Sequence, residues 1–170
     1  MDLGALRLYY TADAFPGPLD YEGTSNRLFH NNGDGTFSDV TQKSGILNTA
    51  GRAMGVTVGG YDNDGWPDIY IANDTMDSYL YHNNHDGTFT NVAQDVNVAF
   101  GANGEGTSAM GPIWGDYDND GWQDLFVSDM RYHRLFHNPR NEKYFLDSTQ
   151  WWKSDSQTPK QCRWRTPADC

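Results

Sequence analysis

The sequence of 170 residues has few cysteines and no long apolar run. Its two cysteines, Cys162 and Cys170, lie at the C-terminal end outside any C-x-x-C motif, so a local disulfide and two free thiols both stay open. No segment approaches the ~20 apolar residues of a membrane span. The first residues, MDLGALRLYY, lack the basic region and apolar core of a signal peptide. If the protein is secreted, its signal was removed or lies outside this sequence.

Basic residues are also scarce, 12 against 23 acidic ones, and the formal net charge is −11. This shortage argues against nucleic acid as a partner, because phosphate binding needs clustered Lys and Arg. The acidic residues gather at repeated positions inside apolar segments, which favours cation binding over a disordered acidic tail. Long stretches of Ala, Leu, Glu and Lys are missing as well. Gly, Asn, Asp and aromatic residues are abundant instead, and this composition predicts an all-β fold rich in turns.

An internal repeat organises most of the chain. The segment SNRLFHNNGDGTFSDV from Ser25 returns as SYLYHNNHDGTFTNV from Ser78, and a degraded copy, HRLFHNPRNEKYFLDST, starts at His133. The second half of the unit, GVTVGGYDNDGWPDIYIAND from Gly55, matches GPIWGDYDNDGWQDLFVSD from Gly111. Successive copies are therefore spaced by 52 to 56 residues.

Each complete copy resolves into four short strands separated by Asp-Gly and Asn-Asn turns. The predicted strands are Met54–Gly59, Asp68–Ala72, Tyr79–His82 and Thr88–Val92 in one copy, Met110–Trp114, Asp124–Ser128, Arg134–His137 and Lys143–Asp147 in the next, and Leu6–Ala12, Arg27–His30 and Thr36–Val40 in an incomplete first copy. The second strands, Ile69–Ala72 and Leu125–Val127, are apolar on consecutive residues, which is typical of strands covered on both faces. Units of this kind describe β-propeller blades, and a β-sandwich of the same strands is the alternative.

The predicted organisation is a set of blades followed by a tail. About three blades, at residues 5–41, 54–93 and 110–149, make up residues 1–149, and the first lacks an opening strand. Because a closed propeller needs at least four blades, we expect an open or partial propeller. The tail, residues 150–170, carries three tryptophans among basic residues. It either docks onto a partner copy or caps the last blade.

The sharpest chemical motif is the segment Asp116–Asp124, DYDNDGWQD. Aspartates occupy positions 1, 3, 5 and 9, and Gly at position 6 allows the sharp turn that brings the carbonyl oxygen of position 7 inward. Such a loop suits Ca²⁺, with Asp116, Asp118, Asp120, Asp124 and the Trp122 carbonyl as ligands. The earlier copy has Gly60 at position 1 and keeps Asp62, Asp64, Asp68 and the Trp66 carbonyl. We therefore predict two calcium sites, the second stronger, with water replacing the missing carboxylate in the first.

Other motifs have plainer interpretations. The segments Asn31–Gly35 and Asn83–Gly87 are predicted hairpin turns rather than further cation loops. The histidines that recur at His30, His82 and His137 are interpreted as blade-packing residues, because a catalytic histidine is normally single. No nucleophile stands beside a histidine and an acid in a recognisable motif, so we expect no enzyme, and a hydrolase is a distant third reading. Asn73 heads the sequon Asn-Asp-Thr and is a candidate glycosylation site.

The pattern YDNDGWPDI, followed by ANDT and LYHNNHDGTF, resembles the FG-GAP/VCBS-like repeat of integrin α-type propellers. Its closest resemblance is to the cartilage acidic protein group, whose blades carry NNGDGTFxDVT, as Asn31–Thr41 does here. The resemblance covers about residues 5–149. It implies calcium in the loop joining the first two strands and an extracellular, non-enzymatic role in adhesion or in recognition of a protein or glycan. The alternative is a secreted structural subunit whose copies join through unpaired blade edges into a filament or matrix.

Overall fold

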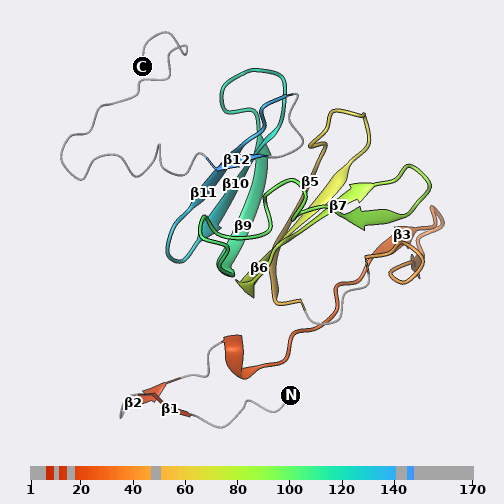
Figure 1. The fold of residues 1–170 in the computed structure, drawn as a ribbon. Coiled ribbons are helices and arrows are strands. Elements are labelled where there is room, and N and C mark those ends of the chain that lie inside the picture. Colours follow the sequence, from red (N-terminus) through yellow and green to blue (C-terminus); the bar gives the residue numbers. More distant parts are fainter. Residues whose placement is uncertain (1–6, 10–11, 15–17, 47–50, 141–144, 148–170) are drawn as a thin grey trace.

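The structure is a computed structural model that describes residues 7–9, 12–14, 18–46, 51–140 and 145–147. Within these ranges the chain is all-β, with twelve strands and one short 3₁₀ helix, η1 (Pro18–Asp20). Two four-stranded antiparallel units lie side by side, and a two-stranded hairpin lies beside the first of them (Figure 1). No helix among the described residues is long and apolar enough to cross a membrane.

The two four-stranded units match the two complete sequence copies, and we call them blades 2 and 3. Blade 2 consists of β5 (Ala53–Gly59), β6 (Asp68–Met76), β7 (Tyr79–Asn83) and β8 (Phe89–Asn91), and blade 3 of β9 (Thr107–Gly115), β10 (Asp124–Asp129), β11 (Arg134–His137) and β12 (Leu146–Asp147). Neighbours in this order pair with each other. The predicted four-strand repeat of propeller type is confirmed, although residues 143–144 of the last predicted strand lie outside the described residues.

Strands β6 and β9 are longer than predicted because their ends pair with each other. Asp74 lies opposite Ser108 and Met76 opposite Thr107, so the two blades share one continuous sheet. The pattern of a single repeat gives no sign of a pairing between two repeats. The added backbone hydrogen bonds join the blades near one end of their inner strands.

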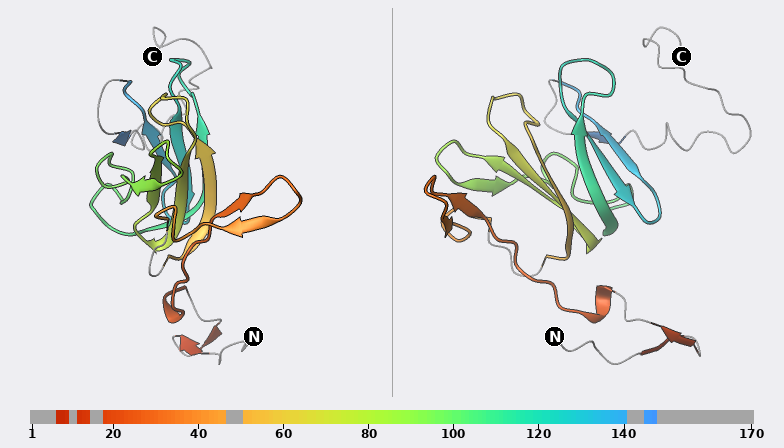
Figure 2. Two further views of the ribbon diagram at one scale, coloured as in Figure 1. Left: turned by 90° about the vertical axis from the view of Figure 1, so that its right-hand side faces the viewer. Right: turned by 180° about the vertical axis from the view of Figure 1, so that it is seen from behind.

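Among the described residues, blade 1 consists of the hairpin β3 (Phe29–Asn31) and β4 (Phe37–Asp39), which projects from the sheets (Figure 2, left). The prediction of a single strand over Leu6–Ala12 is wrong. Strand β1 (Arg7–Tyr9) lies inside that segment and β2 (Ala12–Ala14) begins at its last residue; the two strands pair with each other and lie apart from the blades (Figure 1). Because β1 and β2 pair with each other, some of their backbone N–H and C=O groups are hydrogen-bonded.

The hairpin turns form as the sequence predicts. Oδ1 of Asp34 accepts the N–H of Thr36 at 2.9 Å, and Oδ1 of Asp86 accepts the N–H of Thr88 at 2.9 Å. Each of these carboxylates therefore stabilises the turn in which it lies, as Asp side chains commonly do. The interpretation of both segments as turns is confirmed.

Two apolar cores lie between the blades, one on each side of β6. Tyr70 and Ala72 belong to the core shared with blade 3, and Ile71 belongs to the core that faces blade 1 and includes Leu28. Successive side chains of β6 point to opposite faces of the sheet and are buried on both, as predicted. In blade 3 the same prediction is wrong for one face, because Phe126 is 36% exposed and no described blade covers it.

The sequon asparagine lies inside this packing. Asn73 is 0% exposed, and its Nδ2 donates a hydrogen bond to the carbonyl oxygen of Asp77 at 2.8 Å. The nitrogen that would carry a glycan is therefore inaccessible in the folded chain. The cysteines and the tail at residues 150–170 lie outside the described residues, and the boundary at residue 149 stays a prediction.

Candidate metal sites

The two aspartate-rich segments connect the first and second strands of blades 2 and 3. Loop 1 (residues 60–68) joins β5 to β6, and loop 2 (residues 116–124) joins β9 to β10. Position 4 of each loop, Asn63 and Asn119, has a φ of 57° and 58°, and the glycine at position 6 has a φ of 88° in both. These left-handed conformations favour Asn and Gly. They fold each loop back on itself, so side chains from alternate positions can converge.

Loop 2 brings three carboxylates together. Oxygens of Asp116, Asp118 and Asp120 lie within 4.8 Å of one another. The carboxylate of Asp116 accepts the backbone N–H groups of Asp120 and Gly121 at 2.9 and 2.8 Å. By contrast, Oδ1 of Asp118 is buried and has no hydrogen-bond partner. A buried carboxylate oxygen without a donor is unfavourable, so this atom lacks a protein partner and is available to a cation.

Loop 1 forms a corresponding group of two carboxylates and the histidine that follows in the third strand of the blade. Ligand atoms of Asp62, Asp64 and His82 lie within 4.8 Å of one another. Nδ1 of His82 is 3.3 Å from oxygens of Asp62 and Asp68, yet it is buried and makes no hydrogen bond with either. A Cβ atom at Gly60 would lie 3.4 Å from the carbonyl oxygen of Trp66. That carbonyl oxygen therefore lies near position 1 of loop 1, where loop 2 has the carboxylate of Asp116.

The aspartate at position 9 closes each loop and lies outside these three-residue groups. Asp124 is 1% exposed and accepts the N–H groups of Tyr117 at 3.0 Å and Asn138 at 2.8 Å. Burial raises the pKa of Asp124 above its ordinary value, while these N–H donors lower it. Asp68 in loop 1 makes the same pair of contacts with Tyr61 and Asn83, and burial likewise raises its pKa. Position 9 thus ties the start of the loop to the end of the third strand.

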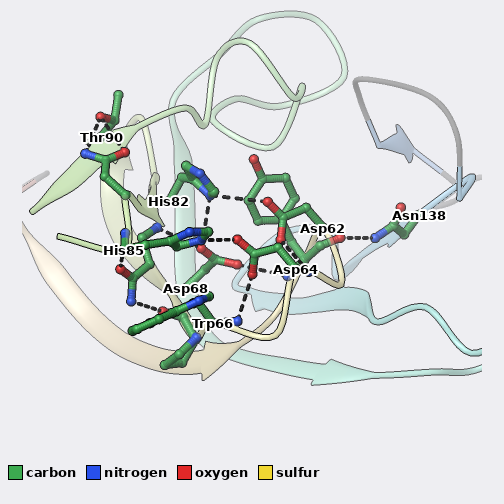
Figure 3. A network of polar contacts seen from close by, with 12 residues as sticks. Asp62, Asp64, Trp66, Asp68, His82, His85, Thr90 and Asn138 are labelled. Atoms are coloured by element: carbon green, nitrogen blue, oxygen red, sulfur yellow. Dashed lines mark hydrogen bonds and ion pairs between the residues drawn. The ribbon is translucent and has the colours of Figure 1, made fainter. Parts of the chain in front are cut away.

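Two of the three recurring histidines, His82 and His137, face these aspartates, which the sequence-based interpretation as blade-packing residues missed. Nδ1 of His137 lies 3.1 Å from Oδ1 of Asp124 and 3.7 Å from Oδ2 of Asp118. His82 occupies the same position beside loop 1 (Figure 3). The signal was present in the sequence, because both histidines recur at one repeat position next to a recurring acidic loop.

A second basic side chain follows three residues after each of these histidines. In blade 2, Nε2 of His85 lies 2.5 Å from Oδ2 of Asp64, and its ring stacks on Trp66 with centroids 5.0 Å apart (Figure 3). In blade 3 the same position is Arg140, whose Nε donates to Oδ2 of Asp120 at 2.5 Å. The Arg140 hydrogen bond holds the pKa of Asp120 below its ordinary value. Loop 2 therefore carries a permanent positive charge that loop 1 lacks.

Hydrogen bonds connect the two loops directly. Nδ2 of Asn63 donates to the carbonyl oxygen of Gly121 at 3.1 Å, and the N–H of Gly60 donates to Oε1 of Gln123 at 3.1 Å. Nδ2 of Asn138 in blade 3 reaches the carbonyl oxygen of Tyr61 at 2.6 Å (Figure 3). These three hydrogen bonds hold the two loops together across the junction of blades 2 and 3.

Stacked four-stranded blades, with an acidic loop between the first and second strand of each, define an open β-propeller module. Comparison with known families agrees, since the model of the FG-GAP-like repeat matches residues 19–71 and 60–127. The chain belongs to this family. It is also 30% identical over 135 residues to human cartilage acidic protein 1, across 72% of this chain and 19% of that protein. The chain thus spans about a fifth of that relative's length.

Membership of this family indicates a repeat module of the structural or recognition type. It also favours an extracellular location. The similarity to the cartilage acidic protein group, expected from the NNGDGTF motif, is confirmed.

Proposed function

We propose that the chain is a calcium-stabilised extracellular module for adhesion to, or recognition of, a protein or glycan. The observation that carries the calcium assignment is the group of convergent carboxylates in loop 2, with the buried, unpartnered Oδ1 of Asp118 among them. Three carboxylates so close together repel one another when no cation is bound. A hard divalent cation that prefers oxygen removes this repulsion, and a flexible carboxylate loop suits Ca²⁺ better than Mg²⁺.

The proposed ligands follow from the two loops. In loop 2 they are Asp116, Asp118, Asp120, Asp124 and the carbonyl oxygen of Trp122. In loop 1 they are Asp62, Asp64, Asp68 and the carbonyl oxygen of Trp66. Bound calcium would neutralise the carboxylates of each loop, and the hydrogen bonds between the loops hold blades 2 and 3 together beside the two sites.

Thermal unfolding with calcium and with a chelator tests this proposal. A bound ligand raises stability by RT ln(1 + [L]/Kd), about 2.7 kcal/mol at a hundred times Kd. We expect calcium to raise Tm and magnesium at the same concentration to raise it less. An equal Tm in calcium and in chelator would show that the loops are not calcium sites.

A structural role in self-assembly is a second candidate function, favoured by the uncovered sheet face at Phe126. Recognition needs a monomer or closed oligomer that displays a surface, whereas a filament subunit needs two complementary ends. Electron micrographs of the purified chain in calcium separate the two, because fibres would favour the structural role.

A further inference from the structure

Loop 1 differs from loop 2 in the kind of ligand atom that it gathers. Its three convergent ligand atoms come from two carboxylates and one imidazole, those of Asp62, Asp64 and His82 (Figure 3), whereas the group in loop 2 consists of three carboxylates. Imidazole nitrogen suits Zn²⁺ and related transition-metal ions, while Ca²⁺ prefers oxygen ligands. The two loops therefore offer different chemistry to a divalent cation.

The imidazole of His82 is placed as a ligand of such an ion. Its Nδ1 lies 3.3 Å from Oδ2 of Asp62. Two ligand atoms of a tetrahedral site with bonds of ~2.0–2.1 Å are separated by about 3.3–3.4 Å, so the spacing matches. Nδ1 is also buried and has no hydrogen-bond partner among the described residues. A buried nitrogen without a partner is unfavourable, and a metal ion bound to its lone pair removes that cost.

The histidine at the same position in blade 3 is engaged differently. Nδ1 of His137 is hydrogen-bonded to Oδ1 of Asp124 at 3.1 Å and lies 3.7 Å from Oδ2 of Asp118. It does not belong to the convergent group of loop 2. Within that group, Asp120 accepts a hydrogen bond from Arg140, whose guanidinium has no acceptor atom and cannot bind a metal ion. Loop 2 thus keeps the all-oxygen set that suits calcium.

The second basic side chain beside loop 1 is compatible with a metal ion. Nε2 of His85 lies 2.5 Å from Oδ2 of Asp64, and its ring stacks on Trp66. An imidazole in contact with a ligating carboxylate orients that carboxylate toward the ion. Loop 1 also lacks a carboxylate at position 1, where Gly60 stands, and the affinity of an oxygen site for calcium depends on its number of charged ligands. The changes in loop 1 therefore weaken its preference for calcium.

We infer that loop 1 is a site for a transition-metal ion of the Zn²⁺ class, with Nδ1 of His82 and one oxygen each from Asp62 and Asp64 as ligands. Three protein ligands leave the fourth tetrahedral position to water. This inference rests on the proposed function only in that loop 1 holds a divalent cation. It goes further, because zinc then displaces calcium from loop 1 and leaves calcium in loop 2.

Calorimetric titration of Zn²⁺ into the full chain in calcium tests the site. We expect one zinc ion to bind per chain. His82→Gln should weaken this binding by more than the roughly 10–100-fold that loss of an outer-shell partner costs. His30→Gln is the matched control, because His30 stands at the same repeat position and is exposed, and it should bind zinc like the wild type. Far-ultraviolet circular dichroism checks that both variants keep their strands.

Two further measurements locate the ion. In the ¹⁵N-labelled chain, zinc should move the ring-nitrogen signals of His82 and leave those of His30 in place. The double variant Cys162→Ser, Cys170→Ser should bind zinc like the wild type, because the ion does not depend on these thiols.

Three results would overturn the inference: equal zinc affinities of the His82→Gln and His30→Gln variants, unmoved His82 signals, or loss of zinc binding in the double cysteine variant. The calcium proposal is judged separately. If zinc binds at His82 while calcium leaves Tm unchanged, the calcium proposal fails alone. If calcium raises Tm while zinc leaves the His82 signals unmoved, the zinc inference fails alone.

Discussion

Loop 2 contains an aspartate that is hydrogen-bonded within the fold, Asp124, and one that has an unpartnered oxygen, Asp118. The substitutions Asp118→Asn and Asp124→Asn distinguish the roles of these two side chains. Asp124 is 1% exposed and accepts two backbone N–H groups, those of Tyr117 and Asn138. An asparagine keeps one acceptor oxygen and turns an amide NH₂ toward the other N–H, leaving a buried donor unsatisfied at a cost of about 1–3 kcal/mol. For a chain of this size that lowers Tm in chelator by roughly 2–12 °C, and in calcium by more, because the variant also loses one of the proposed ligands.

Asp118 behaves differently, because its buried Oδ1 accepts no hydrogen bond from the protein. Its replacement by Asn removes one of three like charges, so Tm in chelator should stay equal or rise. In calcium at about a hundred times Kd the variant should lose the ~2.7 kcal/mol that binding supplies, or roughly 5–11 °C in Tm. Calorimetric scans of both variants in both buffers measure this. If Asp118→Asn destabilised the chelated chain as much as Asp124→Asn does, the cluster would be a structural network and not a metal site.

Three further predictions concern the second loop, the blade junction and the turns. Arg140→Ala removes the built-in positive charge beside loop 2 and should tighten calcium binding there without changing loop 1, as titration calorimetry would show; equal affinity would mean that the guanidinium does not compete with the ion. Gly55→Ala should lower Tm, because a Cβ there meets blade 3 at 2.3 Å, whereas Gly111→Ala at the equivalent position should leave the monomer's Tm nearly unchanged; similar losses would argue against the packing described. The Thr88 hydroxyl, more than its N–H, holds the pKa of Asp86 below 3.8, so the turn is stabilised above that pH and loses this contribution as the pH falls below it. Thr88→Val should raise the pKa of Asp86 toward 3.8 in a carboxyl NMR titration, and an unchanged pKa would exclude the hydroxyl as the cause.

The sequence by itself determined the blade unit and the placement of the acidic loops. Local signals suffice for this, because Asp-Gly turns set hairpins and alternating apolar residues set strand faces. The strand predictions for blades 2 and 3 are accordingly correct to within a few residues. The convergence of Asp116, Asp118 and Asp120 likewise follows from their spacing around the turn at Gly121.

Only the tertiary structure decided which partners these elements meet. The pairing of β6 with β9 and the contact of Arg140 with Asp120 each join residues 20 or more positions apart. Such contacts depend on how distant segments of the chain pack together, and the local sequence pattern of a strand or turn contains no information about them. The same holds for Tyr70 and Phe126. They are equivalent in the repeat, and one is buried and the other exposed because only the first has a blade packed against it.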